Sequence, residues 1–324
     1  MHALVFEEFG GPEVLRYREL PDPPVQAGHV TVDVKASGLN FADLYRRRGN
    51  YRALGEAPYI NGYEGAGVVT GIGPDVTGFQ IGDRVGFFDV ARANVTKLNV
   101  PADRAIPLPG DVGLVDAASV LLQGLTAQYL CHDSAPVREG DWVLVHAAAG
   151  GVGRHLVRFC SAKGARVIAM ASTEEKRRTA RELGAELALG YDGDWVSEIR
   201  NSTDGGARVV FDGVGSTLKR SLAATRPLGS VVTFGMAGGT PEAIDVLDLM
   251  ASSKSLVGGE LWEHLATPAA RKDSCHRLFT ALSQGILQYP PIETFPLADG
   301  AEAHRRLEDR AFAGKIVLVH DGHA

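Results

Sequence analysis

A run of small residues near the middle of the chain has the composition of a phosphate-binding loop. The segment Ala148-Ala149-Gly150-Gly151-Val152-Gly153 follows the apolar run Trp142 to Ala147 and precedes a helical pattern, Val152 to Lys163. It matches the G-x-G-x-x-G fingerprint with alanine in the first glycine place. Small side chains let the backbone approach a pyrophosphate, and the amides that begin the next helix point toward that anion. The order strand, loop, helix therefore predicts a dinucleotide site, with a plain Gly-rich turn as the alternative.

The end of the next strand bears on which dinucleotide is bound. A site that prefers NAD usually places an acid there, about 20 residues after the loop, to hold the ribose 2′-hydroxyl. This chain has Ser172 and, one turn later, Lys176. A hydroxyl and a cation can hold a 2′-phosphate, which favours NADPH. In the alternative interpretation residues 172–175 form a helix capping box and Lys176 is solvated, and Glu174 and Glu175 would repel a phosphate that they faced.

The elements around these motifs alternate between strand and helix, which is typical of a parallel sheet covered on both faces. Repeated over about 140 residues, the alternation predicts a doubly wound nucleotide-binding sheet. The predicted strands are Trp142 to Ala147, Arg166 to Ala169, Leu187 to Leu189, Val209 to Asp212, Ser230 to Gly235 and Ser255 to Gly259. The predicted helices are Val152 to Lys163, Glu174 to Leu183, Asp194 to Asn201 and Thr217 to Thr225.

The first third of the chain has a different pattern. It is rich in Gly and Pro and carries short β-patterned runs at Val30 to Ala36, Gly65 to Ile72 and Asp83 to Phe88. The tail reads as a helix, Ala301 to Leu307, and a strand, Lys315 to His320. That tail is too short for a domain, so we expect it to pack on the N-terminal part. The fold class is α/β, with a β-rich domain beside a parallel-sheet domain.

Composition excludes several classes of protein. The 324 residues carry a formal charge of −6 without a long single-sign block, so a nucleic-acid partner is not expected. The start, Met1 to Phe9, has acids where a secretory signal has bases, and we expect no segment of the roughly 20 apolar residues that cross a bilayer. Cys131, Cys160 and Cys275 are scattered, which indicates neither a disulfide framework nor a thiolate metal site. These features favour a cytoplasmic protein without a membrane partner.

Several motifs in a fixed order resemble one family, the zinc-independent quinone oxidoreductase or zeta-crystallin-like branch of the medium-chain dehydrogenase/reductase superfamily. The motifs are Phe9 to Leu15, Gly38 to Tyr45, Gly62 to Gly67, Gln123 to Ala127 and His146 to Gly153. The resemblance implies a GroES-like catalytic domain at residues 1–121, completed by residues 266–324. It also implies a Rossmann NADPH-binding domain at residues 122–265, and an active site in the cleft.

Zinc-containing members of this superfamily place a Cys and a His ligand in the two early motifs, where this chain has Asn40 and Tyr63. Neither is a usual zinc ligand, and the cysteine quartet of a structural zinc lobe is absent as well. The resemblance therefore implies no metal. Asn40 and Tyr63 also fit ordinary turn and packing roles.

The resemblance also implies which residues contact the cofactor. Lys315 is the weakest candidate, and two departures from relatives, at residues 89–94 and 258–262, leave the acceptor open. The implied contacts are Asn40, Tyr45, Gln123, Thr126, Ala148, Ala149, Gly150, Gly151, Val152, Ser172, Lys176, Tyr191, Gly213, Phe234, Gly235, Gly259, Leu261 and Lys315.

Without a metal, the reaction implied is NADPH-dependent reduction of a quinone or related conjugated carbonyl by hydride transfer. The oxyanion that forms needs a hydrogen-bond donor and then a proton, for which we expect Tyr45 and Asn40, with Tyr51 or solvent as substitutes. Tyr45 packing only against the cofactor is an equal alternative. An enoyl or enone double-bond reductase remains open, as does a non-catalytic NADPH-binding protein, crystallin-like or RNA-binding. The resemblance also implies a homodimer through the edge of the parallel sheet at Ser255 to Leu261.

Overall fold

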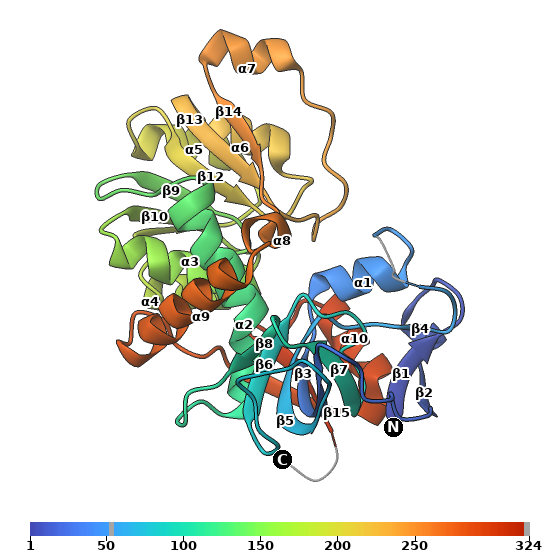
Figure 1. Ribbon diagram of the computed structural model, residues 1–324. Coiled ribbons are helices and arrows are strands. Elements are labelled where there is room, and N and C mark those ends of the chain that lie inside the picture. The colour runs from blue at the N-terminus through green and yellow to red at the C-terminus, as the bar shows by residue number, and fades with distance from the viewer. Residues whose placement is uncertain (52–54, 321–324) are drawn as a thin grey trace. The chain divides into compact units, whose positions relative to one another are not determined.

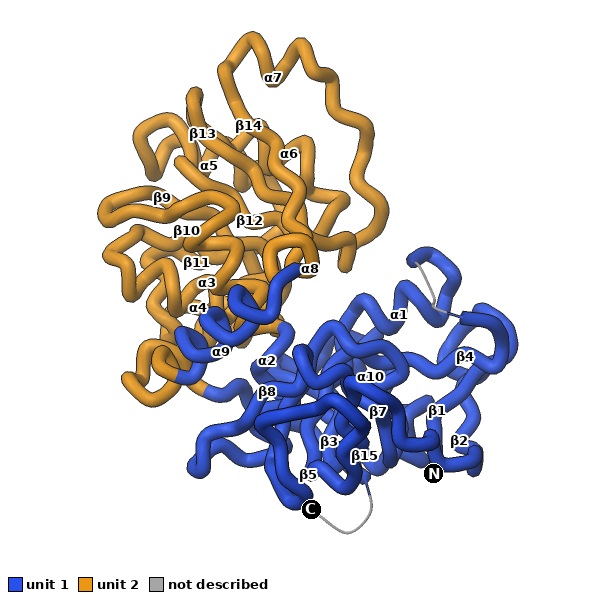
Figure 2. The backbone as a smooth tube through the Cα atoms, in the orientation of Figure 1, with its two compact units in different colours: residues 1–122, 266–279, 289–324 blue, residues 123–265, 280–288 orange. Residues whose placement is uncertain are grey.

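The computed structural model describes residues 1–51 and 55–320 and divides into two compact units (Figure 2). Unit 1 comprises residues 1–122, 266–279 and 289–324, and unit 2 comprises residues 123–265 and 280–288. Residues 280–288 thus lie in unit 2, within the segment that the sequence assigns to the first domain. The last four residues of that segment, 321–324, lie outside the described residues.

Unit 1 is built on a seven-stranded sheet and a three-stranded sheet (Figure 1). The large sheet has the order β15-β16-β3-β5-β6-β8, with β7 also paired to β3, and the small one has the order β2-β1-β4. The strands are β1 His2–Phe6, β2 Arg16–Glu19, β3 His29–Gly38, β4 Tyr59–Ile60, β5 Glu64–Ile72, β6 Arg84–Phe88, β7 Lys97–Pro101, β8 Ala105–Pro107, β15 Ile292–Pro296 and β16 Lys315–Val319. The helices are α1 Phe41–Arg47, α10 Gly300–Glu308 and the short η1 Pro12–Val14 and η3 Leu297–Asp299.

β-branched residues hold the large sheet together. Val30, Val32 and Val34 recur with the two-residue period of a strand, and all three are fully buried against Val69 and Val85. The C-terminal strand β16 is antiparallel to β3, in the register Val317 with Gly38. The prediction that the tail packs onto the N-terminal part is therefore confirmed.

Unit 2 contains a six-stranded sheet in which every pairing is parallel, in the order β11-β10-β9-β12-β13-β14. Helices α3 and α4 pack on β9, β10 and β11, and α6 packs on β12 and β13. The α/β fold class, with a GroES-like and a Rossmann part, is confirmed. The strands are β9 Trp142–Val145, β10 Arg166–Met170, β11 Leu187–Leu189, β12 Ala207–Asp212, β13 Thr225–Thr233 and β14 Ser255–Gly258. The helices are α3 Gly151–Ala162, α4 Glu174–Glu182, α5 Trp195–Ser202, α6 Leu218–Ala224, α7 Val246–Ser252 and α8 Leu261–His264.

Two predicted strands run two residues past the observed ends, and two others, Ser255 to Gly259 and Lys315 to His320, run one residue past the ends of β14 and β16. The first was extended to Ala147, but β9 ends at Val145 because Ala147 has φ +48° and turns the chain into the loop. The fifth was placed at Ser230 to Gly235, whereas β13 begins at Thr225 and ends at Thr233. In both cases the apolar pattern runs on past the last ladder pair. Of the residues beyond these two strand ends, Phe234 and Gly235 are assigned to the cofactor, and the assigned Ala148 directly follows Ala147.

Each of two helices contains residues of both units, because a boundary between the units along the chain falls within it. The sequence patterns did not predict the bounds of either helix. Helix α2 spans Leu114–Tyr129 and continues as a π-helical turn, η2, over Leu130–Ser134. Helix α9 spans Pro268–Ser283 and has few apolar positions among its charged residues. Helix α1 was also missed, because seven residues carry little periodicity.

The expectation that no apolar segment reaches membrane-spanning length needs a correction. Residues 114–134 form one continuous helical stretch of 21 residues that meets the length and hydropathy of a span. Within the structure, 61% of its apolar window is buried. Core helices of water-soluble proteins meet the same criterion, so this stretch is weak evidence for a membrane.

Candidate functional site

The phosphate loop of unit 2 presents uncapped helix amides. Gly150 is the N-cap residue of α3 and supplies no side-chain cap, so the first amides of the helix keep their capacity to bind an anion. A Cβ added to Gly153 would lie 2.3 Å from the carbonyl oxygen of Ala147, so only glycine allows this approach of helix to loop. The buried Ala148 and Ala149 keep the loop small. This cradle fits a pyrophosphate, as the sequence predicts.

The side chain of Gln123, on α2, lies against this loop. A Cβ on Gly151 would come within 2.3 Å of the Gln123 amide oxygen, so glycine at this position makes room for that side chain. Thr126, one turn further along α2, is half-buried, and so is Val152. Gln123 and Gly151 are therefore brought together, as the shared cofactor assignment requires.

The end of β10 carries two cations and one capping hydroxyl. Thr173, rather than Ser172, caps α4, since its hydroxyl accepts a bond of 3.3 Å from the amide of Lys176. The exposed Ser172 is left at the strand end. Arg177, which sequence reasoning missed, donates to the carbonyl of Ala171 at 3.3 Å.

The negative charge of Glu174, one of the two acids expected to repel a phosphate here, is offset by arginines. Glu174 accepts hydrogen bonds of 2.8 Å from both Arg177 and Arg181, which hold its pKa below the usual range. Its negative charge is therefore matched within its own helix. The surroundings of Ser172 and Lys176 can accept a phosphate.

A network of buried polar side chains is hydrogen-bonded to the phosphate loop. Tyr191 accepts a hydrogen bond of 2.9 Å from the amide of Ala147, and its ring stacks on His146. Ser221 joins His146, at 2.9 Å, to Asp212, at 2.7 Å. Tyr191, predicted at the adenosine phosphate, thus holds the left-handed residue that shapes the loop. Sequence reasoning missed the other three because their pairing is tertiary.

Burial lowers the pKa of His146 to about 4 from 6.5, so the ring is neutral in the folded protein near neutral pH. The stability that depends on the neutral ring is present above about pH 6.5 and is lost as the pH falls toward 4, because the unfolded ring takes up the proton first. The slope of the unfolding free energy against pH gives the number of protons that the protein takes up when it unfolds. We expect His146→Gln to lower this number by up to one over this pH range. Urea unfolding at several pH values measures it, and His304, shifted in the same direction by burial, stays as a common background. Equal slopes for both proteins would contradict the assignment.

The nicotinamide half of the predicted site is formed by the ends of three neighbouring strands. Phe234 follows β13 and donates its amide to the carbonyl of Asp212, at the end of β12, at 3.0 Å. Gly259 follows β14 and donates to Thr233 at 2.8 Å. A Cβ on Gly213 would lie 2.8 Å from the Phe234 ring, and one on Gly235 would lie 2.9 Å from the Gly213 carbonyl. Leu261 is buried at the start of α8. All five of these predicted residues therefore follow the carboxyl ends of neighbouring strands, on the same side of the sheet.

Unit 1 contains a buried trio of Asn40, Glu64 and Lys315. The Lys315 ammonium lies 2.7 Å from Glu64 Oε2 and 2.9 Å from Asn40 Oδ1, and the Asn40 amide donates to Glu64 Oε2 at 3.0 Å. Lys315 is 1% exposed and Glu64 is fully buried. Glu64 Oε1 accepts the Leu122 amide at 2.6 Å. Lys315 thus orients Asn40, a role that the sequence did not indicate. Glu64 was visible only as part of the motif Gly62 to Gly67.

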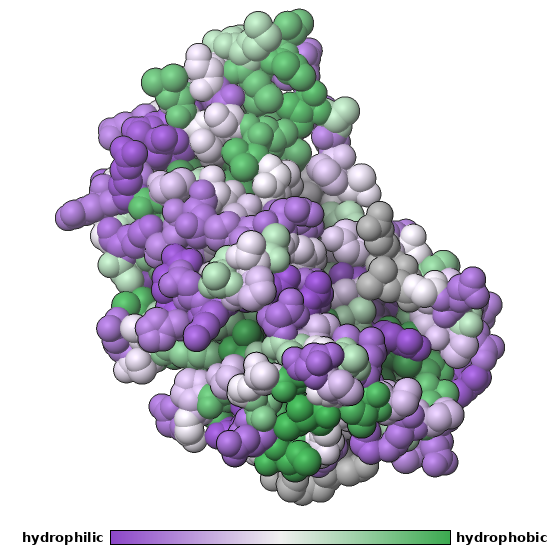
Figure 3. All heavy atoms as spheres, viewed as in Figure 1, coloured by the Kyte–Doolittle hydropathy of each residue, from purple (hydrophilic) through white to green (hydrophobic). Residues whose placement is uncertain are grey.

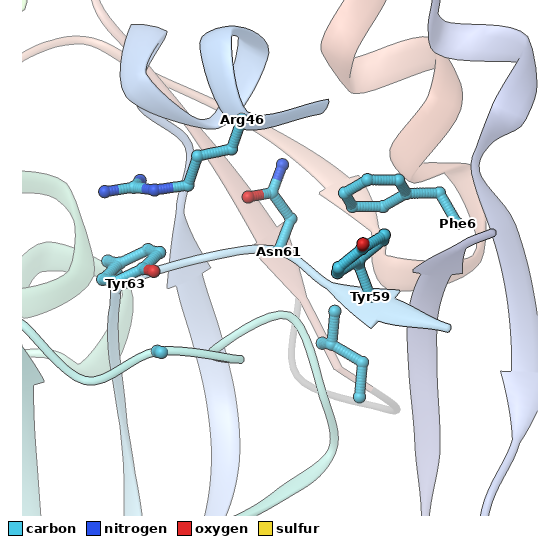
Figure 4. Close-up of a pocket in the computed structure, with 7 residues that line it drawn as sticks. Phe6, Arg46, Tyr59, Asn61 and Tyr63 are labelled. Carbon is cyan, nitrogen blue, oxygen red and sulfur yellow. The ribbon is translucent and has the colours of Figure 1, made fainter. Parts of the chain in front are cut away.

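The predicted proton donors lie on and after α1. Tyr45 is half-buried, with its ring 6.5 Å from that of Phe41. Tyr51 is 40% exposed. The Arg46 guanidinium lies 5.0 Å from the ring of Tyr51 and 3.5 Å from that of Tyr63. Figure 4 shows Arg46 over Tyr63 beside Asn61, in a small pocket of unit 1.

Tyr63, which the resemblance places at the position of a zinc ligand, is packed under a cation. A positive charge there opposes a bound metal ion. Among residues 1–51 and 55–320, no group of three or more His, Cys, Asp or Glu side chains is arranged to hold a metal. Asn40, at the other ligand position, is engaged by Lys315.

Comparison with known proteins agrees with both units. Residues 26–137 match the family described as alcohol dehydrogenase GroES-like domain, and residues 151–263 match the family described as zinc-binding dehydrogenase. A 2-haloacrylate reductase of a Burkholderia species is 36% identical, over 98% of this chain and 98% of its own. A quinone oxidoreductase of Pseudomonas aeruginosa is also 36% identical, over 97% of this chain and 98% of its own.

A solved structure adds the cofactor. The Escherichia coli quinone oxidoreductase complexed with NADPH superimposes with a TM-score of 0.95 at 32% identity, over 98% of this chain and all of that one. Identity at this level over nearly the full length of several relatives establishes kinship, and the quinone oxidoreductases among them indicate the branch. The chain belongs to the zinc-independent quinone oxidoreductase branch of the medium-chain dehydrogenase/reductase superfamily.

Proposed function

We infer that this protein is an oxidoreductase that uses NADPH to reduce a quinone or related conjugated carbonyl acceptor, without zinc. The observation that carries the inference is the uncapped start of α3, joined to a strand end that offers Ser172, Lys176 and Arg177 in place of an acid. The names of the two relatives and the NADPH in the neighbouring structure support the same reaction.

When bound, NADPH supplies the hydride. The acceptor gains that hydride and one proton, and NADP⁺ is released, so the balance needs no further reagent. The amides of α3 and the side chains at the end of β10 bind and orient the two phosphate-bearing ends. The ring-lined strand ends around Gly213 and Phe234 give an apolar surface that excludes water. Tyr45 donates to the acceptor oxygen as it gains negative charge, with Tyr51 as a substitute. Asn40, the other donor expected from the sequence, does not fit this role, because its side-chain amide already donates to the Gly38 carbonyl and to Glu64.

Tyr45→Phe tests the donor. We expect kcat to fall about 10-fold with NADPH binding unchanged, because one hydrogen bond to a charged oxygen contributes about 1.5 kcal/mol. Stopped-flow measurement of NADPH oxidation separates this step from product release. Tyr51→Phe is the matched comparison, expected to be nearly silent while Tyr45 is present. Unchanged turnover in Tyr45→Phe would reject the catalytic role and leave only packing.

Lys176→Ala tests the coenzyme. We expect the Kd for NADPH to rise about 10-fold and that for NADH to stay constant, since only NADPH carries the 2′-phosphate. Calorimetric titration with both coenzymes measures it. Arg178→Ala, on the same helix with a 70% exposed side chain, is the matched control. A strong preference of the native protein for NADH would contradict the choice of coenzyme.

The second candidate activity is reduction of the carbon–carbon double bond of an enone or enoate, which the 2-haloacrylate reductase relative favours. A panel of quinones and enones with 4-deuterated NADPH distinguishes the two. Carbon-bound deuterium in the product indicates double-bond reduction, whereas a quinol carries the added hydrogens on oxygen. Binding of NADPH without oxidation by any acceptor would instead support a non-catalytic protein.

A homodimer is part of the same proposal. Strand β14 is an edge of its sheet, and α7 beside it in the sequence exposes the apolar side chains of Val246, Leu247 and Met250, each at least 65% exposed. Figure 3 shows apolar atoms gathered over α7. An exposed edge and an apolar helix are a suitable surface for a second copy. Sedimentation as a monomer would refute it. We also propose a cytoplasmic location, since all three cysteines are buried and unpaired.

A further inference from the structure

Arg46 is a buried cation with an incomplete set of partners. It is 5% exposed, and its Nε has no hydrogen-bond partner among the residues that the structure describes. Its Nη1 reaches Asp43 Oδ1 only at 3.4 Å. The other oxygen of Asp43 accepts from a different donor, the backbone N–H of Asn40, at 2.9 Å. A guanidinium group removed from water is normally matched by carboxylate oxygens on its donor edge.

The unsatisfied Nε belongs to a side chain that lines a pocket. Figure 4 shows Arg46 and Tyr63 on one side of it, Phe6 and Tyr59 on the other, and Asn61 between them. The Arg46 guanidinium lies over the ring of Tyr63, so the face of the cation is covered while the Nε edge lacks an acceptor. The Asn61 amide is engaged by the carbonyl of Asp43 at 2.8 Å. Arg46 is therefore the side chain of this lining with a spare charge-assisted donor.

Two arginines that pair with the adjoining loop, residues 89–94, leave an excess of positive charge near Arg46. The backbone of this loop is tied to the pocket wall, with Val90 donating to the carbonyl of Tyr63 at 3.3 Å. Asp89 in this loop is matched by two arginines, Arg104 at 3.1 Å and Arg271 at 3.3 Å. Asp89 and Asp43 thus face three guanidinium groups, including that of Arg46. The excess charge is positive.

We propose that the pocket binds a carboxylate carried by the acceptor, so that this enzyme selects anionic conjugated carbonyl compounds. A carboxylate supplies the flat pair of oxygens that a guanidinium edge recognises, and its single negative charge balances the local excess. The proposal rests on the proposed reduction of a conjugated acceptor and names the feature that distinguishes the preferred acceptor. Arg46 holds the carboxylate equally before and during hydride transfer, so its contribution appears in KM rather than in kcat.

The experiment compares one acid with its ester. The acceptors are trans-3-benzoylacrylate, an enone with a carboxylate, and its neutral ethyl ester, each with saturating NADPH. For the native enzyme we expect a KM at least 10-fold lower for the acid than for the ester, from a charge-assisted, two-oxygen contact. In Arg46→Gln the KM for the acid should rise about 100-fold, with kcat and the ester kinetics changed less than about threefold. Arg46→Lys, which keeps the charge, should restore part of the preference.

The matched control is Arg48→Gln, on the same stretch but with its side chain 46% exposed and paired to Glu308. It should leave both acceptors unaffected. Equal losses for acid and ester in Arg46→Gln, or a native enzyme without preference for the acid, would overturn the proposal. If circular dichroism shows that Arg46→Gln folds poorly, Arg46→Lys and the native enzyme in high salt provide the test. The proposal would be overturned if the preference for the acid over the ester stayed at its full value both in Arg46→Lys and in the native enzyme at high salt.

A binding measurement separates this proposal from the proposed reaction. Calorimetry of benzoylacrylate with the NADP⁺-loaded protein needs no turnover. Binding that depends on Arg46, without NADPH oxidation by either acceptor, would support the pocket and reject the reaction. Reduction of the ester without binding of the acid would support the reaction and reject the pocket. Failure of both measurements would reject both.

Discussion

Replacing Lys315 by Met should lower the free energy of unfolding by about 3–5 kcal/mol, because it leaves the charge of Glu64 buried without its cation. The two groups are 2.7 Å apart and both are excluded from water, so neither can be solvated when the other is removed. Asn40 also loses its 2.9 Å contact with the ammonium group. Urea unfolding followed by circular dichroism measures the loss.

The double variant Glu64→Gln with Lys315→Met should recover most of that loss, since it removes the uncompensated charge together with its partner. Arg18→Met is the matched control in the same unit. Its pair with Glu7 is 2.6 Å long, but the two side chains are 47% and 61% exposed, so about 0–1 kcal/mol is expected. A similar small loss for Lys315→Met would show that water reaches the trio.

Replacing Gly153 by Ala should raise the Kd for NADPH about 100-fold, which corresponds to about 2.7 kcal/mol. The added Cβ would lie 2.3 Å from the carbonyl oxygen of Ala147 and 2.9 Å from the Cα of Ala148. Both are backbone atoms, so the start of α3 must move away from the loop. The amides that would hold the pyrophosphate then no longer converge. Calorimetric titration with NADPH measures the change.

Gly110→Ala is the control, because a Cβ at that position meets nothing within 4 Å and lies outside the proposed site. It should bind NADPH as the native protein does. If Gly153→Ala also binds NADPH with the native Kd, the loop can accommodate the added Cβ. The close approach of α3 to the loop would then not be required for pyrophosphate binding.

The local signals in the sequence were sufficient for most of unit 2. Strand β11 has the predicted bounds, Leu187–Leu189, and α4 differs from its prediction by one residue at its end. Each is bounded by turn or capping residues that act within a few positions, so the pattern needs no tertiary information. Helix α9 was missed because its apolar residues are few among charged and small ones, although Leu278 among them is fully buried.

In the candidate site, too, the features that depend on local sequence were predictable and those that depend on tertiary contacts were not. The loop at Gly150 and the strand ends at Gly213 and Gly259 were predictable, since small residues after a strand carry a direct signal. The partner of Lys315 was not, because Glu64 is 251 residues away and each residue alone resembles a surface charge. Arg46 was missed for a related reason, since an arginine near a helix end is usually solvated. The roles of the individual site residues remain predictions that the variants above address.

The position of β16 beside β3 has a consequence for how the protein is made. During synthesis, the strands up to β8 leave the ribosome with one neighbour of β3 missing and with the carboxylate of Glu64 lacking its counter-charge. Residues 123–265 emerge next as a nearly continuous stretch and can complete their own sheet first. The earliest part of the polypeptide is therefore the last to mature, and a nascent chain stalled before Lys315 should be a target for chaperones and proteases.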